Sequence, residues 1–259
     1  MPPEKDWRAT PDEAAEGALR YSDIAIGYLS RNAGYQAAYR RALARVRRGT
    51  VAADDATAAL VRRWGLSFHA DPNAAFDPRM VVARPDFAPD HLVLAQPPAD
   101  IGTAAALYLD ALGEVRTRLT LDGRLHVILA DRDGDAHLWV LDAPDRPLAV
   151  ILPLGPDLAV RLAAAERLRR RLRGLAAGRP PLRPPPSRRR HLLTLLRVLD
   201  GRDAGVTRRE LAATLIDPDV RGFSAAEWAD SRERKRISRW LAEAIELRDR
   251  GYLRLLRGG

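Results

Sequence analysis

The sequence contains no cysteine, and its 259 residues include only two lysines and two methionines. The lack of cysteine excludes disulfides, cysteine-ligated zinc fingers, iron–sulfur clusters and thiol nucleophiles. No run of 18 apolar residues occurs, so we expect no transmembrane helix. The N-terminal residues are polar and acidic without an apolar core, so we expect no signal peptide and predict a cytoplasmic protein.

Sequence motifs for catalysis and cofactor binding are also lacking. None of GxxxxGK[ST], GxGxxG, GxSxG and HExxH occurs, and no nucleophile–base or acid–base pair stands out. We therefore expect no enzyme, no cofactor and no metal site. The DRDGD segment at 131–135 lacks the glycine and glutamate positions of an EF-hand, which favours a hairpin turn.

The five histidines give no pattern typical of a metal site. His126 and His137 can meet across a predicted hairpin, but no acidic residue or metal-ligand spacing supports a ligand role. We expect surface or core roles for them and for the remaining three, which are His69, His91 and His191.

Basic residues, nearly all of them arginine, outnumber acidic residues, and they are unevenly distributed along the chain. The net charge of +9 divides into −3 over residues 1–155 and +12 over residues 156–259. A basic excess confined to one part of a chain indicates a nucleic-acid or membrane-surface partner for that part.

The first two segments combine helices and strands. Residues 1–65 are predicted to form a helical unit, because apolar residues recur there at three- and four-residue spacing. An aromatic-rich core is expected in it, supplied by Trp7, Tyr21, Tyr28, Tyr35, Tyr39 and Trp64. Residues 66–155 hold a proline-rich segment with strand-like runs at 80–84 and 91–96, then a four-strand antiparallel β-meander with an Asp122-Gly123 turn.

The third segment, residues 156–259, is predicted to be a basic helical domain with a proline-rich linker at 174–187. Capping boxes begin helices at Thr207 and Ser224, and a long helix is predicted from Asp230 to Arg250. A tail (252–256) follows as a short strand or docked segment. Helices in this order are typical of a helix-turn-helix domain, and the whole chain is predicted to be α+β.

The long helix carries the candidate site. At 100° per residue, four cations fall within an arc of about 100°, opposite an apolar arc that must face the other helices. Arginine in such a position can bond guanine bidentately, and neighbouring residues can hold phosphates. The predicted DNA-contacting residues are Arg208, Arg209, Ser231, Arg232, Lys235, Arg236 and Arg239, with a phosphate-contacting arm at Arg188, Arg189 and Arg190.

Two observations keep alternatives open. A cationic helix face is often only a solvated face. The connection from Asp217 to Phe223 is longer than the 3–4-residue turn of a compact helix-turn-helix, so a variant motif or an unrelated bundle also fits.

A set of aromatic and polar positions near the N-terminal end forms a recognisable pattern. Its members are Asp6-Trp7-Arg8, the segment YSDIAIGYLSRN (21–32), Tyr35, Tyr39, Trp64-Gly65-Leu66, Phe68 and Asp71-Pro72. These residues resemble the small transcriptional regulator-like domain of proteobacterial mobile elements. Ala33-Gly34 replaces that family's proline region, and Gly27 replaces an acidic residue.

A second pattern lies in the C-terminal helices. Its members are Leu196-Arg197, Leu199-Asp200-Gly201, Ala204-Gly205-Val206, Arg208-Arg209-Glu210-Leu211-Ala212, the run 234–239, Gly251-Tyr252 and Leu255-Leu256. These residues resemble the helix-turn-helix variant domain of excision activators and antiactivators of integrative and conjugative elements.

The two resemblances together imply a transcriptional activator of excision or transfer genes. They imply double-stranded DNA as partner, with RNA polymerase or a small antiactivator protein as further partners. The alternative is an antiactivator-like regulator whose helical C-terminal domain binds a protein rather than DNA. The sequence leaves the oligomeric state open.

Overall fold

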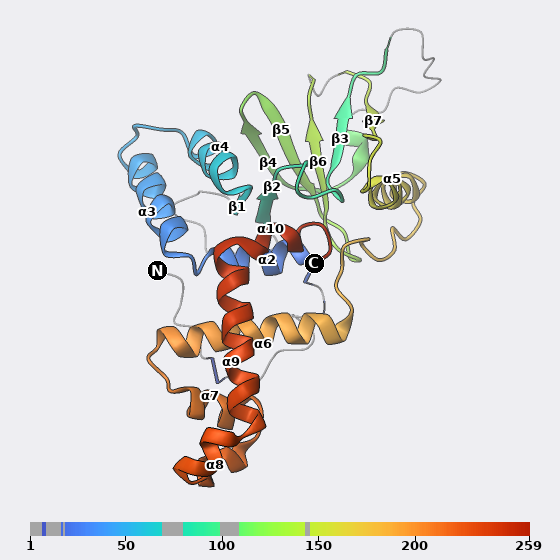
Figure 1. Ribbon diagram of the computed structural model, residues 1–259. Helices are drawn as coiled ribbons and strands as arrows, with labels where there is room; N and C mark the ends of the chain where they lie inside the picture. Colours follow the sequence, from blue (N-terminus) through green and yellow to red (C-terminus); the bar gives the residue numbers. More distant parts are fainter. Residues whose placement is uncertain (1–6, 9–16, 18, 69–79, 99–108, 143–145) are drawn as a thin grey trace.

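The computed structural model shows a mixed sheet with helices around it and a helical extension at the C-terminal end (Figure 1). It describes residues 7–8, 17, 19–68, 80–98, 109–142 and 146–259. The start of the predicted helical stretch at 12–16, His69, Asp71-Pro72 and the turn beginning at Asp145 lie outside the described residues. Within the described ranges, no helix is both long and apolar enough to span a membrane.

Three helices follow one another near the N-terminal end: α2 (Tyr21–Leu29), α3 (Ala33–Arg47) and α4 (Ala53–Trp64). The Asn32 side chain accepts a hydrogen bond from the Tyr35 backbone nitrogen (3.1 Å) and so caps α3. Gly65 ends α4 in the left-handed conformation at φ 80°. The three helices lie where the apolar spacing predicts them.

The strands form two sheets. Strand β1 (Leu66–Phe68) pairs antiparallel with β2 (Val81–Ala83). The larger sheet has the order β4-β5-β6-β3-β7. Its strands are β3 (Leu92–Ala95), β4 (Val115–Leu121), β5 (Arg124–Leu129), β6 (Ala136–Val140) and β7 (Ala149–Ile151).

Strands β4, β5 and β6 form three strands of the expected four-strand antiparallel meander, but the fourth, β7, pairs with β3 instead of β6. Asp122 and Gly123 both have positive φ, 50° and 72°, which is the two-residue turn predicted for this hairpin. The sheet then departs from chain order, because β3 lies between β6 and β7 and runs parallel to β6. The buried side chains of β3 suit an interior position, whereas β7 is short and partly exposed and lies at the edge. The α+β class is confirmed, with a mixed sheet.

The two faces of the large sheet have different covers. Helix α5 (Leu158–Leu172) and the short 3₁₀ helix η2 (Leu109–Leu112) pack on one face. Helix α4 and strand β2 cover part of the other face, where Trp139 and Leu119 are buried. Each face therefore has its own apolar cluster.

The C-terminal helices are α6 (Pro186–Asp203), α7 (Arg208–Leu215), α8 (Ala225–Asp230) and α9 (Arg232–Glu246), with the 3₁₀ helix η3 (Pro218–Gly222) between α7 and α8. The long helix predicted from Asp230 begins at Arg232, because Ser231 has an extended backbone and separates α8 from α9. A π-helical turn, η4 (Leu247–Gly251), leads into α10 (Tyr252–Leu255). The predicted docked tail is thus helical, and Tyr252 and Leu255 are buried.

One core joins the two ends of the chain. Helix α2 packs against α6 and α10, and the Tyr28 hydroxyl donates to the Leu192 carbonyl (2.7 Å). Arg31 forms a bidentate ion pair with Asp200 at 2.6 and 2.7 Å. Trp7, expected in an N-terminal aromatic core, is instead buried among residues of α6, α7 and α9. The N-terminal helices are therefore not packed only on one another.

The proline-rich segment 174–187 lies against the body of the protein. Leu182 is buried, and its carbonyl accepts a hydrogen bond from the Tyr21 backbone nitrogen (3.2 Å). The Gly178 backbone nitrogen donates to Asp133 (2.9 Å). These contacts fix the course of the segment 174–187, which connects α5 to α6, along the body of the protein.

Candidate nucleic-acid interface

Helix α9 is anchored on one face and exposed on the other. Ser231 caps it by accepting a hydrogen bond from the Arg234 backbone nitrogen (3.1 Å). Ile237 and Ala244 are fully buried, and α9 packs against α6 and α7. Its opposite face, which the sequence predicts to be cationic, is exposed at Arg232, Lys235, Arg236 and Arg239.

The environment of these four cations leaves them accessible. The Arg232 guanidinium donates to Glu233 (2.6 Å), yet its side chain is 90% exposed. Arg236 lies over the Trp240 ring, 4.6 Å from its centroid, which orients the guanidinium. None of the described carboxylates forms an ion pair with Lys235 or Arg239. The stripe therefore carries positive charge that the protein itself leaves mostly uncompensated.

A shallow depression runs along this stripe and includes two residues that the helical spacing did not single out. It is lined by Arg232, Arg234, Lys235, Ser238 and Arg239. Arg234 falls near the apolar arc by angle, but the N-terminal end of α9 projects beyond α6 (Figure 1). At that end a side chain can be exposed on either side of the helix. Only the tertiary arrangement could add Arg234 to the surface.

The two predicted contacts on α7 differ. Arg208, in the first turn of α7, is exposed beside the cap at Thr207. Arg209 turns back to the η3 segment and donates to the carbonyl oxygens of Val220 (3.1 Å) and Phe223. The structure thus uses Arg209 to hold the connection between α7 and α8.

Glu210 and Arg221 reinforce this connection from α7. Their ion pair spans 2.9 Å, and the hydrogen bond from Arg221 lowers the pKa of Glu210 below its ordinary value. On α9, the hydrogen bond from Arg232 likewise lowers the pKa of Glu233. Both carboxylates therefore remain ionised at neutral pH.

The predicted arm at Arg188, Arg189 and Arg190 is part of regular helix α6. Pro186 begins this helix with the φ that a first turn requires, so the three arginines do not trail from the fold. Arg188 lies 3.5 Å from Glu243, and His191 contacts the same carboxylate. Glu243 is about 16 Å along α9 from Arg232, so these arginines lie apart from the start of the stripe.

Three family models match consecutive parts of the chain. Residues 6–69 match a proteobacterial transcriptional regulator-like domain, residues 90–150 a domain of unknown function (DUF7012), and residues 151–257 the RovC-type domain described as "T6SS, Transcription factor, DNA binding domain". No curated protein matches the chain.

These matches test the family resemblances of the N-terminal and the C-terminal residues. The transcriptional regulator-like resemblance of the N-terminal part is confirmed. The C-terminal part matches a DNA-binding domain, but the match names no conjugative element and no excision factor. Together they indicate a DNA-binding transcriptional regulator, with the cationic face of α9 inside the DNA-binding match.

Proposed function

We propose that this chain is a non-enzymatic transcriptional regulator that binds double-stranded DNA through α9 and the adjacent helices. The observation that carries the proposal is the exposed cationic stripe on a helix whose opposite face packs against α6 and α7, within a region that matches a DNA-binding domain. Such a helix can enter the major groove while the rest of the domain rests on the backbone.

The residues have different roles in this proposal. Arg232 and Arg236 lie in the first half of α9 and contact base edges or phosphates, with Ser231, Lys235 and Arg239 on phosphates. Arg208 contacts the backbone from α7. Arg209 acts indirectly, because its guanidinium holds the η3 segment. Arg188, Arg189 and Arg190 add positive charge from α6 rather than entering the minor groove as an arm.

At a finer level, we propose that the regulator activates excision or transfer genes of a mobile genetic element. The support for this level is the sequence resemblance of both ends of the chain to regulators of such elements. RNA polymerase, or a small antiactivator protein, is then the expected protein partner. Detection of transcripts from an adjacent integrase or excisionase gene, with and without this protein, tests the direction of control.

The test of DNA binding is fluorescence anisotropy with a labelled duplex covering the DNA upstream of its own gene, over a salt series. With about five phosphate contacts, the slope of log K against log salt is about −4 to −5. The double charge reversal Arg232→Glu/Arg236→Glu is expected to weaken binding by more than about 100-fold with unchanged far-UV circular dichroism.

A matched control separates the α9 face from net charge. Arg40 and Arg41 are exposed on α3, so Arg40→Glu/Arg41→Glu changes the net charge by the same amount on another helix. This control should weaken binding by less than about threefold. Equal losses in the two double variants, or no salt dependence in the native chain, would refute DNA binding through α9.

The alternative function is a regulator whose C-terminal helices bind a protein. The observation that favours it is the insertion of η3 and α8 between α7 and α9, which departs from a compact helix-turn-helix. Here the native chain would co-purify with a partner protein after nuclease treatment, and the anisotropy titration would show no binding.

A further inference from the structure

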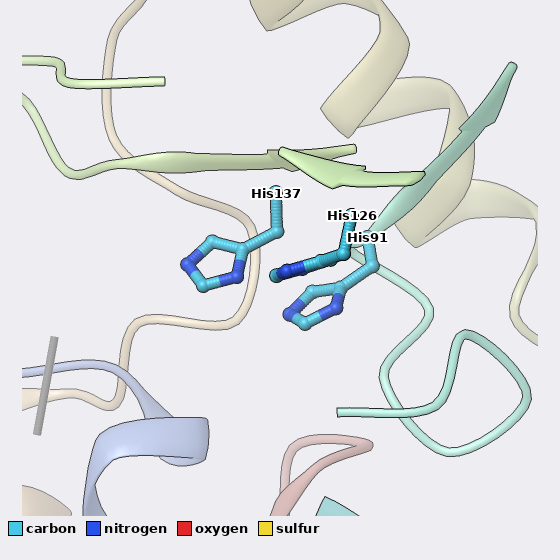
Figure 2. A group of neighbouring side chains, drawn as sticks. All are labelled: His91, His126 and His137. Atoms are coloured by element: carbon cyan, nitrogen blue, oxygen red, sulfur yellow. The ribbon is translucent and has the colours of Figure 1, made fainter. Parts of the chain in front are cut away.

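Three histidines that lie far apart in the sequence meet on one face of the large sheet (Figure 2). His126 on β5 is paired with Trp139, and His137 on β6 is paired with Ile128, so the two histidines are diagonal neighbours on the same face. In the parallel pair, Leu92 lies beside Leu138, which places His91 next to His137. The register of three neighbouring strands therefore assembles the group.

The geometry of the group is compact. The ring centroids of His91 and His137 are 4.5 Å apart, and those of His126 and His137 are 5.4 Å apart. One ring nitrogen from each histidine can be chosen so that all three lie within 4.8 Å of one another. The three side chains are at most 2% exposed.

The ring nitrogens are largely without hydrogen-bond partners. Both nitrogens of His126 and Nδ1 of His137 are buried and unpaired, and His91 is buried with a hydrogen-bond interaction to the Ala83 backbone. Nε2 of His137 accepts a hydrogen bond from Arg20 (2.7 Å). Since buried polar groups in proteins are nearly always paired, unpaired ring nitrogens gathered in one place point to a ligand that binds them.

The protonation state suits a metal ligand. Burial, together with the charge of Arg20, lowers the pKa of His91 to about 3. Burial also lowers the pKa of His126 and of His137 well below the ordinary value. At neutral pH each ring is therefore uncharged and has one nitrogen lone pair to donate.

We propose that His91, His126 and His137 bind a divalent transition-metal ion of the zinc class through one nitrogen each. Zinc takes imidazole nitrogens at about 2.0–2.1 Å in a tetrahedron, which places the nitrogens about 3.3 Å apart. The present spacing of up to 4.8 Å must therefore shorten when an ion binds. Three protein ligands leave the fourth position to water or another ligand, and with no cysteine in the chain no thiolate is available as a donor.

Arg20 is a positively charged side chain next to the proposed site, so metal binding must be compatible with its contacts. It binds Nε2 of His137 from outside the group, whereas Nδ1 faces the other two rings (Figure 2). Ligation through Nδ1 moves the ring proton from Nδ1 to Nε2, with no net gain or loss of protons. The guanidinium then keeps the Asp135 carbonyl (3.3 Å) and Asp23 (3.5 Å) as acceptors.

Carboxylates near Arg20 offset the positive charge of its guanidinium beside the histidine group. Asp23, Asp90 and Asp135 all interact electrostatically with Arg20. These acidic side chains partly offset the charge of Arg20, which would otherwise repel a divalent cation. All three histidines lie within residues 90–150, the part that matches a domain of unknown function, so the site would give this domain a ligand.

The test uses the untagged full chain, because an affinity tag of histidines would itself bind metal. The chain is stripped with a chelator and then titrated with zinc or cobalt. We expect one ion per chain, visible d–d absorption of tetrahedral cobalt, and X-ray absorption showing nitrogen or oxygen ligands at about 2.0–2.1 Å from zinc. Failure of the native chain to bind either ion at micromolar concentration would overturn the proposal.

Single variants identify the ligands. His126→Gln and His137→Gln are each expected to weaken zinc binding by more than about 100-fold, since a ligand is lost. The matched control is His191→Gln, because His191 lies on α6 beside Glu243 and is the other described histidine. An equal loss in the control would also overturn the proposal. The cobalt spectrum of the native chain decides the question if a variant fails to fold.

Discussion

Helices α5 and α9 each carry five cations but use them in different ways. On α5, Arg161 donates to the Pro85 carbonyl (3.3 Å), and Arg171 donates to the carbonyls of Leu112 (2.8 Å) and Ala130 (2.6 Å). On α9, Lys235 and Arg239 are exposed, and the described residues offer them no carboxylate partner.

The difference shows that the net charge of a segment does not measure a binding surface. Arginine has five N–H donors, so it can satisfy buried carbonyls as readily as phosphates. Arg167, for example, bridges the carbonyls of Gly134 and Gly178 at 2.9 Å each. Part of the basic charge of residues 156–259 therefore supports the fold, while other cations of this segment, those of α9 among them, are exposed.

The largest expected effect is on stability, from Arg171→Ala. Its side chain is 16% exposed and joins α5 to the ends of η2 and β5, so its loss leaves two backbone carbonyls without a donor. We expect a decrease of about 3 kcal/mol in the free energy of unfolding, measured by urea denaturation. DNA affinity of the folded fraction should be unchanged. If Arg171→Ala instead lowered DNA affinity and left the free energy of unfolding unchanged, Arg171 of α5 would be a DNA contact and not a structural residue.

A smaller effect is expected from Arg209→Ala, because this residue belongs to the structural group despite its place beside Arg208. Its guanidinium holds the carbonyls of Val220, Arg221 and Phe223. We expect about 1–2 kcal/mol lower stability by urea denaturation. Arg208→Ala is the matched control and should leave stability within about 0.5 kcal/mol. If Arg209→Ala and Arg208→Ala had equal free energies of unfolding, Arg209 would be an exposed surface cation without a structural role.

The smallest effect is expected from Arg239→Ala, which removes one exposed cation. The change should weaken DNA binding about tenfold, equivalent to about 1.4 kcal/mol, with the salt slope reduced by about 1. Stability should stay within about 0.5 kcal/mol. Fluorescence anisotropy measures the DNA affinity and urea denaturation measures the stability, both on one preparation of the variant. Unchanged affinity would show that the interface ends before this turn of α9.

Much of the local structure could be predicted because it depends on neighbouring residues. The Asp122-Gly123 turn, the cap at Thr207 and the capping box at Ser224 are all present. The amphipathic pattern of α9 also predicted which of its faces is buried. The start of the last helix was predicted two residues too early, at Asp230, although Ser231 is itself a good N-cap residue.

The position of β3 could not be predicted, because pairing between distant strands leaves little trace in a single sequence. The same is true of the histidine group, whose members lie on β5, on β6 and just before β3 and have no common spacing. The sequence suggested only that His126 and His137 can meet. His91 joins them through the parallel pairing of β3 with β6, which the expected meander did not contain.

The helices, the turns, the α+β class and the cationic face of α9 could all be predicted from the order of residues, since each of these follows from spacing along one segment. Long-range packing sets which arginines remain exposed, where Trp7 packs and which histidines meet. These depend on contacts between residues far apart in the chain, where burial and the available hydrogen-bond partners determine what each side chain does.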